Sequence, residues 1–134
     1  MIGLPSLAQL DRAATTRIWL CTGPTDMRRG FDRLAEQGQS VTRQDPHGAH
    51  LFVFRSRGGD RLKVLYWDKD GYALWYKRLE AGTFKLPKLD AGQESVELRA
   101  SELAMILDGI DLASVKRTTR FRRAVESARA DKST

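Results

Sequence analysis

The stretch from residue 50 to residue 78 constrains the fold of this chain more than any other part of the sequence. It holds three segments rich in β-branched and aromatic residues, at 50–55, 61–67 and 72–78, separated by short turns that contain glycine and aspartate. Parallel strands need a long crossover, whereas connections this short join antiparallel neighbours. The stretch therefore predicts an antiparallel meander of three strands.

The turn between the last two strands, Asp68-Lys69-Asp70-Gly71, raises a choice between structure and chemistry. Type I turns favour aspartate at the first position and glycine at the last, so we expect a type I turn closed by a left-handed Gly71. A calcium loop fails on spacing, because its first and last ligand positions fall on Tyr66 and Lys77. Two acids at an exposed turn tip also make a poor catalytic pair, and no further acids complete a metal-binding centre.

Before the meander, residues 17–21 are predicted to form a short strand, followed by the breaker Thr22-Gly23-Pro24. We expect a helix capped by Thr25 and stopped by Gly38. Four apolar residues recur in it at helical spacing and predict its buried face: Met27, Phe31, Leu34 and Ala35. This helix is expected to pack on one face of the sheet.

After the meander, short further strands are expected at 82–87 and 96–98. Ser101 is the predicted cap of a last helix that ends near Gly109. Its apolar face is predicted to consist of Leu103, Ile106, Leu107 and Ile110. The fold class is therefore α+β: an antiparallel β-meander packed against one main helix, with a short C-terminal helix and a flexible basic tail. We divide the chain into a flexible leader (1–14), one domain (15–112) and a basic, disordered tail (113–134).

The formal net charge is +6, and it is unevenly distributed, because residues 115–134 contain seven Lys or Arg and only two Asp or Glu. A polyanionic partner such as nucleic acid is the first hypothesis, and a solvated tail that aids solubility is the alternative. The segment 115–123 has five bases and one aromatic residue, a composition suited to phosphate contacts. The candidate nucleic-acid-binding residues are Lys116, Arg117, Arg120, Arg122 and Arg123 in the tail, and Arg28, Arg29, Arg55, Arg57, Lys63, Lys77 and Arg78 in the domain.

A purely structural interpretation of the bases near the hairpin also stays open. Arg61 and Lys77 can pair with Asp60, Asp68 or Glu80 instead of binding a ligand. The aromatic residues of this region raise a similar choice, since residues 61–80 hold two of the three tryptophans and all three tyrosines. Core packing is the favoured interpretation for a domain this small, and a platform for single-stranded nucleic acid is the alternative.

Other chemistry finds little support. Cys21 is the only cysteine, which excludes an intrachain disulfide and fits a reducing cytoplasm. His47 and His50 lack the cysteines or acids of a zinc pattern, so we expect neither a metal nor another cofactor. No apolar run approaches the roughly 20 residues that span a bilayer, and the first residues do not resemble a secretory signal. A cytoplasmic protein without a membrane partner is expected.

Three motifs resemble one known family. They are TGPTDMRRGFDRL at 22–34, LFVFRSRGGDRLKVLYWDKDGYALWYKRLEAGTFKLP at 51–87 and SELAMILDGIDL at 101–112. Together they resemble the small TnpB, or Orf2-like, accessory proteins of the sixty-six group of bacterial insertion sequences. The resemblance extends from Arg17 to Leu112, and the long middle motif is highly specific. The basic tail lies outside the strongest motifs.

The resemblance implies a non-enzymatic helper of DNA transposition, encoded beside a larger transposase. DNA, in particular the ends of the insertion sequence, and the cognate transposase are the implied partners, and a homo-oligomer is possible. The family supplies no catalytic residues, and it differs from the larger RNA-guided nuclease that shares the name TnpB. The alternative function is a protein-interaction module that docks on the transposase through a second apolar sheet face around Leu65, Trp67 and Trp75.

Overall fold

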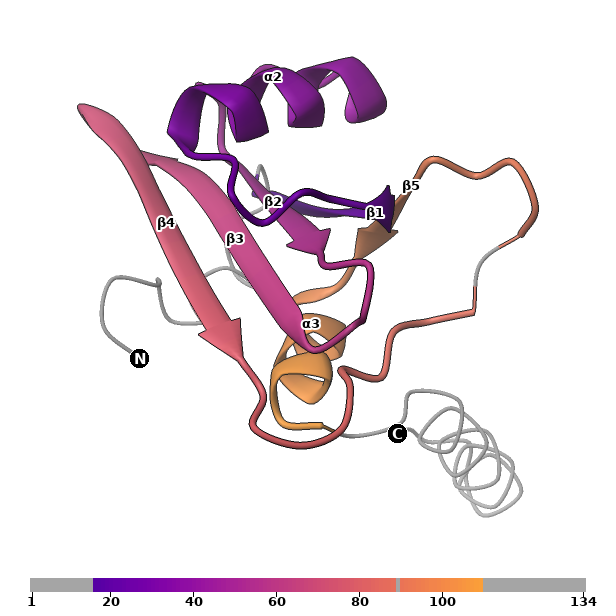
Figure 1. Ribbon diagram of the computed structural model, residues 1–134. Helices are drawn as coiled ribbons and strands as arrows, with labels where there is room; N and C mark the ends of the chain where they lie inside the picture. The colour runs from indigo at the N-terminus through magenta and orange to yellow at the C-terminus, as the bar shows by residue number, and fades with distance from the viewer. Residues whose placement is uncertain (1–15, 89, 110–134) are drawn as a thin grey trace, which may run out of the picture.

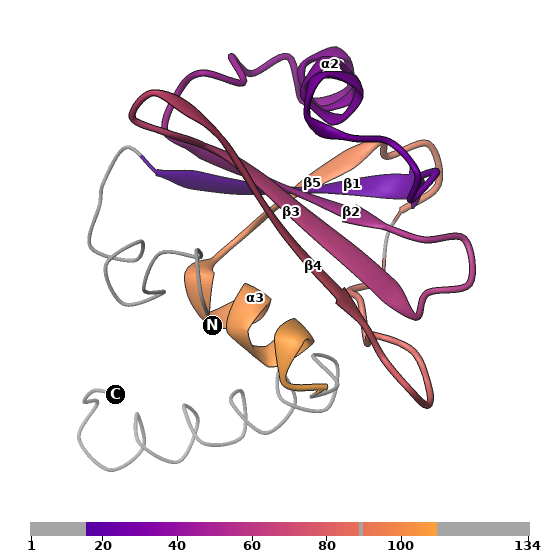
Figure 2. The same ribbon diagram turned by 60° about the vertical axis from the view of Figure 1, so that its left-hand side comes forward.

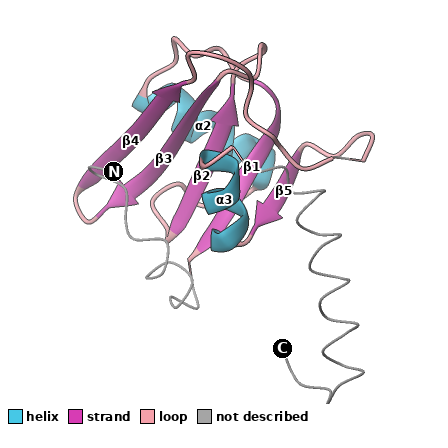
Figure 3. Cartoon of the chain, turned by 90° about the horizontal axis from the view of Figure 1, so that it is seen from below, coloured by secondary structure: helices cyan, strands magenta, loops and turns pink. Residues whose placement is uncertain are grey.

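The computed structural model describes residues 16–88 and 90–109, which form one mixed five-stranded sheet with two helices. The elements follow one another as β1 (Arg17–Pro24), α2 (Phe31–Thr42), β2 (His50–Arg55), β3 (Arg61–Asp68), β4 (Gly71–Arg78), β5 (Ser95–Leu98) and α3 (Ala100–Leu107). Across the sheet the strand order is β4-β3-β2-β1-β5 (Figures 1 and 3). The predicted α+β class is confirmed.

The predicted meander is present, since β3 pairs antiparallel with both β2 and β4. The strand β1 adds to it in parallel with β2, because α2 provides the crossover that a parallel pair needs. The short strand β5 pairs antiparallel with β1 on the other side. The prediction of a strand at 82–87 was wrong: Phe84 is buried instead, and its N–H donates a hydrogen bond to the carbonyl oxygen of Gly59 in the turn before β3.

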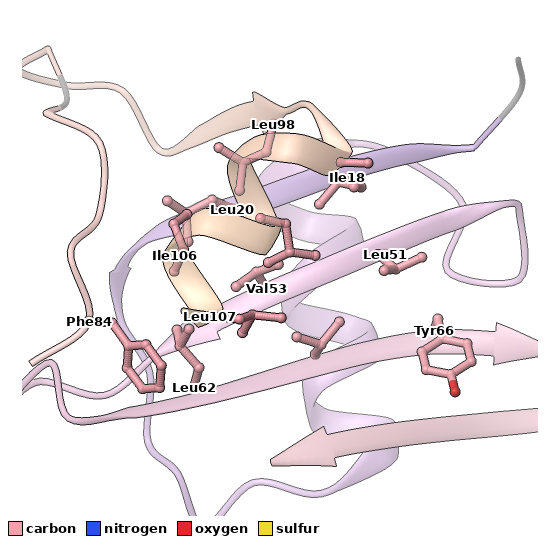
Figure 4. Packing of buried hydrophobic residues seen from close by; sticks show 13 residues of the cluster. Ile18, Leu20, Leu51, Val53, Leu62, Tyr66, Phe84, Leu98, Ile106 and Leu107 are labelled. Carbon is pink, nitrogen blue, oxygen red and sulfur yellow. The ribbon is translucent and has the colours of Figure 1, made fainter. Parts of the chain in front are cut away.

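Each face of the sheet is covered by one helix, with α2 on one side and α3 on the other (Figure 2). Strand alternation sends neighbouring residues to opposite sides, so that Val53 faces α3 while Phe52 faces α2. The larger core lies under α3 and includes Leu20, Leu62 and Ile106 (Figure 4). The last helix therefore closes the second sheet face.

The helix α2 begins later than predicted, because residues 25–30 form a loop held by side chains. Gly30, not Thr25, occupies the N-cap position. The ammonium of Lys63 donates hydrogen bonds to two carbonyl oxygens of this loop, those of Met27 (2.6 Å) and Arg29 (2.9 Å). A lysine on β3 thus fixes the path of the chain into α2.

Gly38 does not stop α2, which continues to Thr42. A Cβ atom at Gly38 would stand 3.0 Å from a ring carbon of Phe52, so glycine is what lets the helix lie close to β2. The helix ends instead at Arg43, whose φ of 63° is left-handed and whose N–H donates to the carbonyl oxygen of Gln39.

The β3–β4 turn and the start of α3 also differ in detail from the predictions. In the β3–β4 turn the left-handed residue is Lys69, with φ 57°, and Gly71 does not have a positive φ. The cap of α3 is Arg99 rather than Ser101, with the carboxylate of Glu102 accepting the Arg99 N–H at 2.8 Å. The helix ends beside Gly109 as predicted, with φ 79° there, while Ile110 lies outside the described residues.

Candidate nucleic-acid interface

The sheet topology brings six of the seven predicted bases of the domain to one end, together with Arg61, which was not among the candidates. The parallel strands β1 and β2 both finish at this end, β3 begins there, and β4 finishes there. Backbone hydrogen bonds tie the segments together, from Thr25 N to Arg55 O and from Leu79 N to Asp60 O, both 2.8 Å. We call this region the basic end; its bases are Arg28, Arg29, Arg55, Arg57, Arg61, Lys77 and Arg78.

Three acids at the basic end pair with neighbouring bases. Asp26 contacts Arg28 at 2.9 Å, Asp60 contacts Arg61 at 3.7 Å, and Glu80 contacts Arg78 at 3.4 Å. The Arg28 guanidinium, through its hydrogen bonds, holds the pKa of the Asp26 carboxyl well below its usual range. Two more acids lie at this end: the carbonyl oxygen of Glu94 accepts the Thr22 N–H, and Asp108 follows the last turn of α3. The seven bases still outnumber the five acids.

The turns at the opposite end of the sheet carry more acids than bases. The turn between β3 and β4 carries Asp68, Lys69 and Asp70, and the loop after α2 carries Arg43 and Asp45. The domain is therefore electrically polar along its strands. A polyanion would therefore be attracted to the basic end rather than to the opposite end of the sheet.

Some bases at the basic end have exposed side chains without an ion pair, whereas others are held by contacts within the protein. Arg57 and Lys77 are exposed and form no ion pair within the described part of the chain. The predicted alternative of an Arg61–Asp60 pair is present. Arg55 has a structural contact, since its Nε donates to the carbonyl oxygen of Thr22 at 2.7 Å. Arg29 donates to Gln37 Oε1 at 2.8 Å while remaining half-exposed.

Lys63 does not belong to this surface, contrary to its place among the candidate residues. Only 6% of Lys63 is exposed, and its ammonium binds two backbone carbonyl oxygens. The ring of Tyr76 lies 4.7 Å from the same nitrogen. Strand alternation explains the placement, because Lys63 stands between Leu62 and Val64 and points to the α2 face. Sequence alone does not distinguish this inward lysine from an exposed one.

The tail candidates Lys116, Arg117, Arg120, Arg122 and Arg123 lie outside the described residues, as do the proposed boundaries at 14 and 112. The chain leading to them can be followed to Gly109. The last turn of α3 packs at the basic end, where Leu107 lies near Leu62 and Phe84 (Figure 4). The described chain thus finishes on the side where the domain's own bases gather.

The aromatic residues are mostly used in packing. Tyr66 is buried on the α3 face and Trp75 packs partly against the same cluster. The alternative docking hypothesis required one exposed apolar face around Leu65, Trp67 and Trp75. These residues do not form such a face, because Leu65 is fully buried on the α2 side and Trp75 points to the α3 side. Among the residues that the structure describes, the exposed large hydrophobic side chains are Phe31 and Tyr76, at 48% and 49% exposure.

Within residues 16–88 and 90–109, no three His, Cys, Asp or Glu side chains are placed to hold a metal ion together. In the same ranges, none of the helices has both the length and the apolar character needed to cross a membrane.

Comparison with known proteins agrees with the motifs. The model of the family described as IS66 Orf2 like protein matches residues 16–117. The chain is similar to the uncharacterized protein y4hO of Sinorhizobium fredii, with 39% identity over 111 residues, covering 83% of this chain and 95% of that one. It is also similar to the uncharacterized protein y4jC of the same organism, with 37% identity over 101 residues, covering 75% and 85%. No solved structure matches significantly.

Proposed function

Since this chain belongs to the IS66 Orf2-like family of insertion-sequence accessory proteins, we propose that it is a non-enzymatic factor that binds DNA during transposition. The observation that carries the proposal is the convergence of seven bases from three separate segments at one end of the sheet. Folding alone does not require this clustering, because most of these side chains are exposed. The tail bases extend the same surface in this proposal.

The contacts we propose are mainly with phosphates. Arg57 and Lys77 are exposed and project from two different segments, so together they can follow a nucleic-acid backbone. Guanidinium and ammonium contacts to phosphate supply affinity and position, with little sequence preference. The ends of the insertion sequence are the proposed DNA, and the cognate transposase in the bacterial cytoplasm is the proposed protein partner.

Docking on the transposase without DNA binding is the weaker candidate. It depended on an exposed apolar sheet face, and both faces of the sheet are covered by helices. The charge polarity of the domain favours the DNA-binding proposal instead.

The test is fluorescence anisotropy of the full chain with a labelled duplex of the terminal inverted repeat, over a series of salt concentrations. A scrambled duplex and a single strand serve as comparison ligands. One variant removes two charges at the basic end, Arg57→Ala with Lys77→Ala. A second variant neutralises tail bases, with Arg120→Ala, Arg122→Ala and Arg123→Ala.

The matched control removes two charges at the opposite end, Arg43→Asn with Lys69→Asn. Both positions have a left-handed backbone, with φ of 63° and 57°, which asparagine tolerates. We expect the basic-end variant to bind more weakly and to lower the salt slope by about 0.9 for each phosphate that it no longer neutralises. The control is expected to bind as the wild type does. Absence of wild-type binding at moderate salt, or an equal loss in the control, would reject the proposed surface.

A further inference from the structure

The strand β4 presents an open edge of the sheet. Two backbone hydrogen bonds beside β3 show which backbone groups of β4 face the sheet and which face away from it. Leu79 N donates to Asp60 O, and Ser56 N donates to Arg61 O. Even-numbered residues of β3 therefore bond to β4, and odd-numbered ones bond to β2. By the register of the β3–β4 pair, the backbone groups of Tyr72, Leu74, Tyr76 and Arg78 point away from the sheet.

This edge lacks most of the features that protect edge strands from pairing. It is eight residues long, contains no proline and is continuously paired to β3 without a bulge. In the described part of the chain, no backbone hydrogen bond reaches the amides of Tyr72, Leu74 or Tyr76 from outside the sheet. The other edge, β5, is only four residues long. Thus β4 is the edge that can accept another strand.

We propose that β4 pairs antiparallel with β4 of a second copy of this chain, which joins the two sheets into one. A two-fold axis at Leu74 places Leu74 opposite Leu74 of the second copy and Tyr72 opposite Tyr76. Each protomer then offers three outward residues with one donor and one acceptor each, which gives about six backbone hydrogen bonds. Tyr76, 49% exposed in the single chain, acquires an aromatic neighbour in this arrangement.

Charge complementarity selects both the occupant and the register. The turn at one end of β4 carries the exposed Asp70, and the other end carries the exposed Arg78. An antiparallel second copy brings Asp70 beside Arg78 twice, once on each side of the axis. Moving the axis to Trp75 would instead place Asp70 beside Glu80, and moving it to Ala73 would place Lys69 beside Lys77.

The first experiment tests the register by cross-linking the full chain under oxidised glutathione. In Leu74→Cys, the two new cysteines face each other with Cα atoms about 5.5 Å apart, inside the range for a disulfide. In the control, Tyr76→Cys, each cysteine faces Tyr72 and lies roughly 14 Å from its equivalent. We expect a covalent dimer with the first variant only. Equal cross-linking of both variants would overturn the register, and failure of Leu74→Cys to cross-link would do the same.

The second experiment tests the edge by sedimentation equilibrium of the wild type and two variants at Tyr76. Tyr76→Pro removes an outward N–H and the ring, whereas Tyr76→Ala removes the ring alone. We expect a wild-type dimer, a loss of roughly tenfold or more in dimer affinity for the proline variant, and a smaller loss for the alanine variant. Circular dichroism checks that both variants fold. A monomeric wild type, or equal losses in folded variants, would overturn the proposal; DNA binding is measured separately and does not decide it.

Discussion

Gly38 of α2 lies directly against the ring of Phe52 on β2. A Cβ atom at position 38 would stand 3.0 Å from Cδ1 and 3.1 Å from Cγ of that ring. The ring is fully buried, so any movement of the ring must displace neighbouring core side chains. The spacing between helix and sheet on this face is therefore set by the missing side chain of one glycine.

We expect Gly38→Ala to destabilise the protein although alanine favours helix. The helical preference of alanine contributes about 1 kcal/mol, whereas overpacking a filled core costs roughly 1–3 kcal/mol. The expected net result is a lower free energy of unfolding, measured by urea denaturation. Ser40→Ala, at an exposed position of the same helix, is the control and should be neutral or slightly stabilising. A more stable Gly38→Ala would show that the core relaxes around the new methyl group.

Gly38 also illustrates which features of the structure could be predicted from the sequence and which could not. Glycine is a common helix stop, and only the contact with Phe52, which is distant in sequence, reveals its packing role. The meander was predictable, because strand alternation and short turns are local signals. The place of β1 and the inward direction of Lys63 were not, because both depend on contacts between distant segments. For the same reason, the bases could be identified in the sequence, but their convergence at one end required the topology.

His50 is expected to make folding sensitive to mild acid. Burial, followed by the nearby charge of Arg17, lowers the pKa of His50 below its usual value. Trp19 Nε1 also donates to His50 Nδ1 at 3.4 Å, a contact that a protonated ring cannot accept. The unfolded chain therefore binds the proton more readily than the folded one. The contribution of His50 to stability is full above the ordinary pKa of about 6.5 and falls as pH drops toward the lowered value.

Two measurements check the behaviour of His50. An NMR titration of its ring should give a midpoint below that of a model peptide. Urea denaturation between about pH 7 and pH 5 should show a smaller loss of stability in His50→Gln than in the wild type. A ring that titrates at or above the ordinary value would contradict the role assigned to burial.

Cys21 is expected to be unreactive in the folded protein. Only 1% of the residue is exposed, and burial raises the pKa of its thiol to about 12. Because the thiolate is the reactive form, a thiol reagent should label Cys21 slowly in buffer and rapidly after unfolding in guanidinium chloride. Ser40→Cys supplies an exposed thiol on α2 as the comparison and should react at once. Equally rapid labelling of Cys21 in folded wild type would mean that β1 opens readily.

Lys63 is expected to stabilise the fold rather than to bind a ligand. Replacing it with methionine keeps much of the aliphatic length but removes the donor to the carbonyl oxygens of Met27 and Arg29. Two partly buried acceptors then lack a partner, and we expect Lys63→Met to lower the free energy of unfolding by about 1–3 kcal/mol. The control is Lys77→Met on the adjacent strand, where the exposed side chain should change stability by no more than about 0.5 kcal/mol. Urea denaturation of both variants decides the matter, because equal stability of the two would show that the loop before α2 does not depend on the buried ammonium.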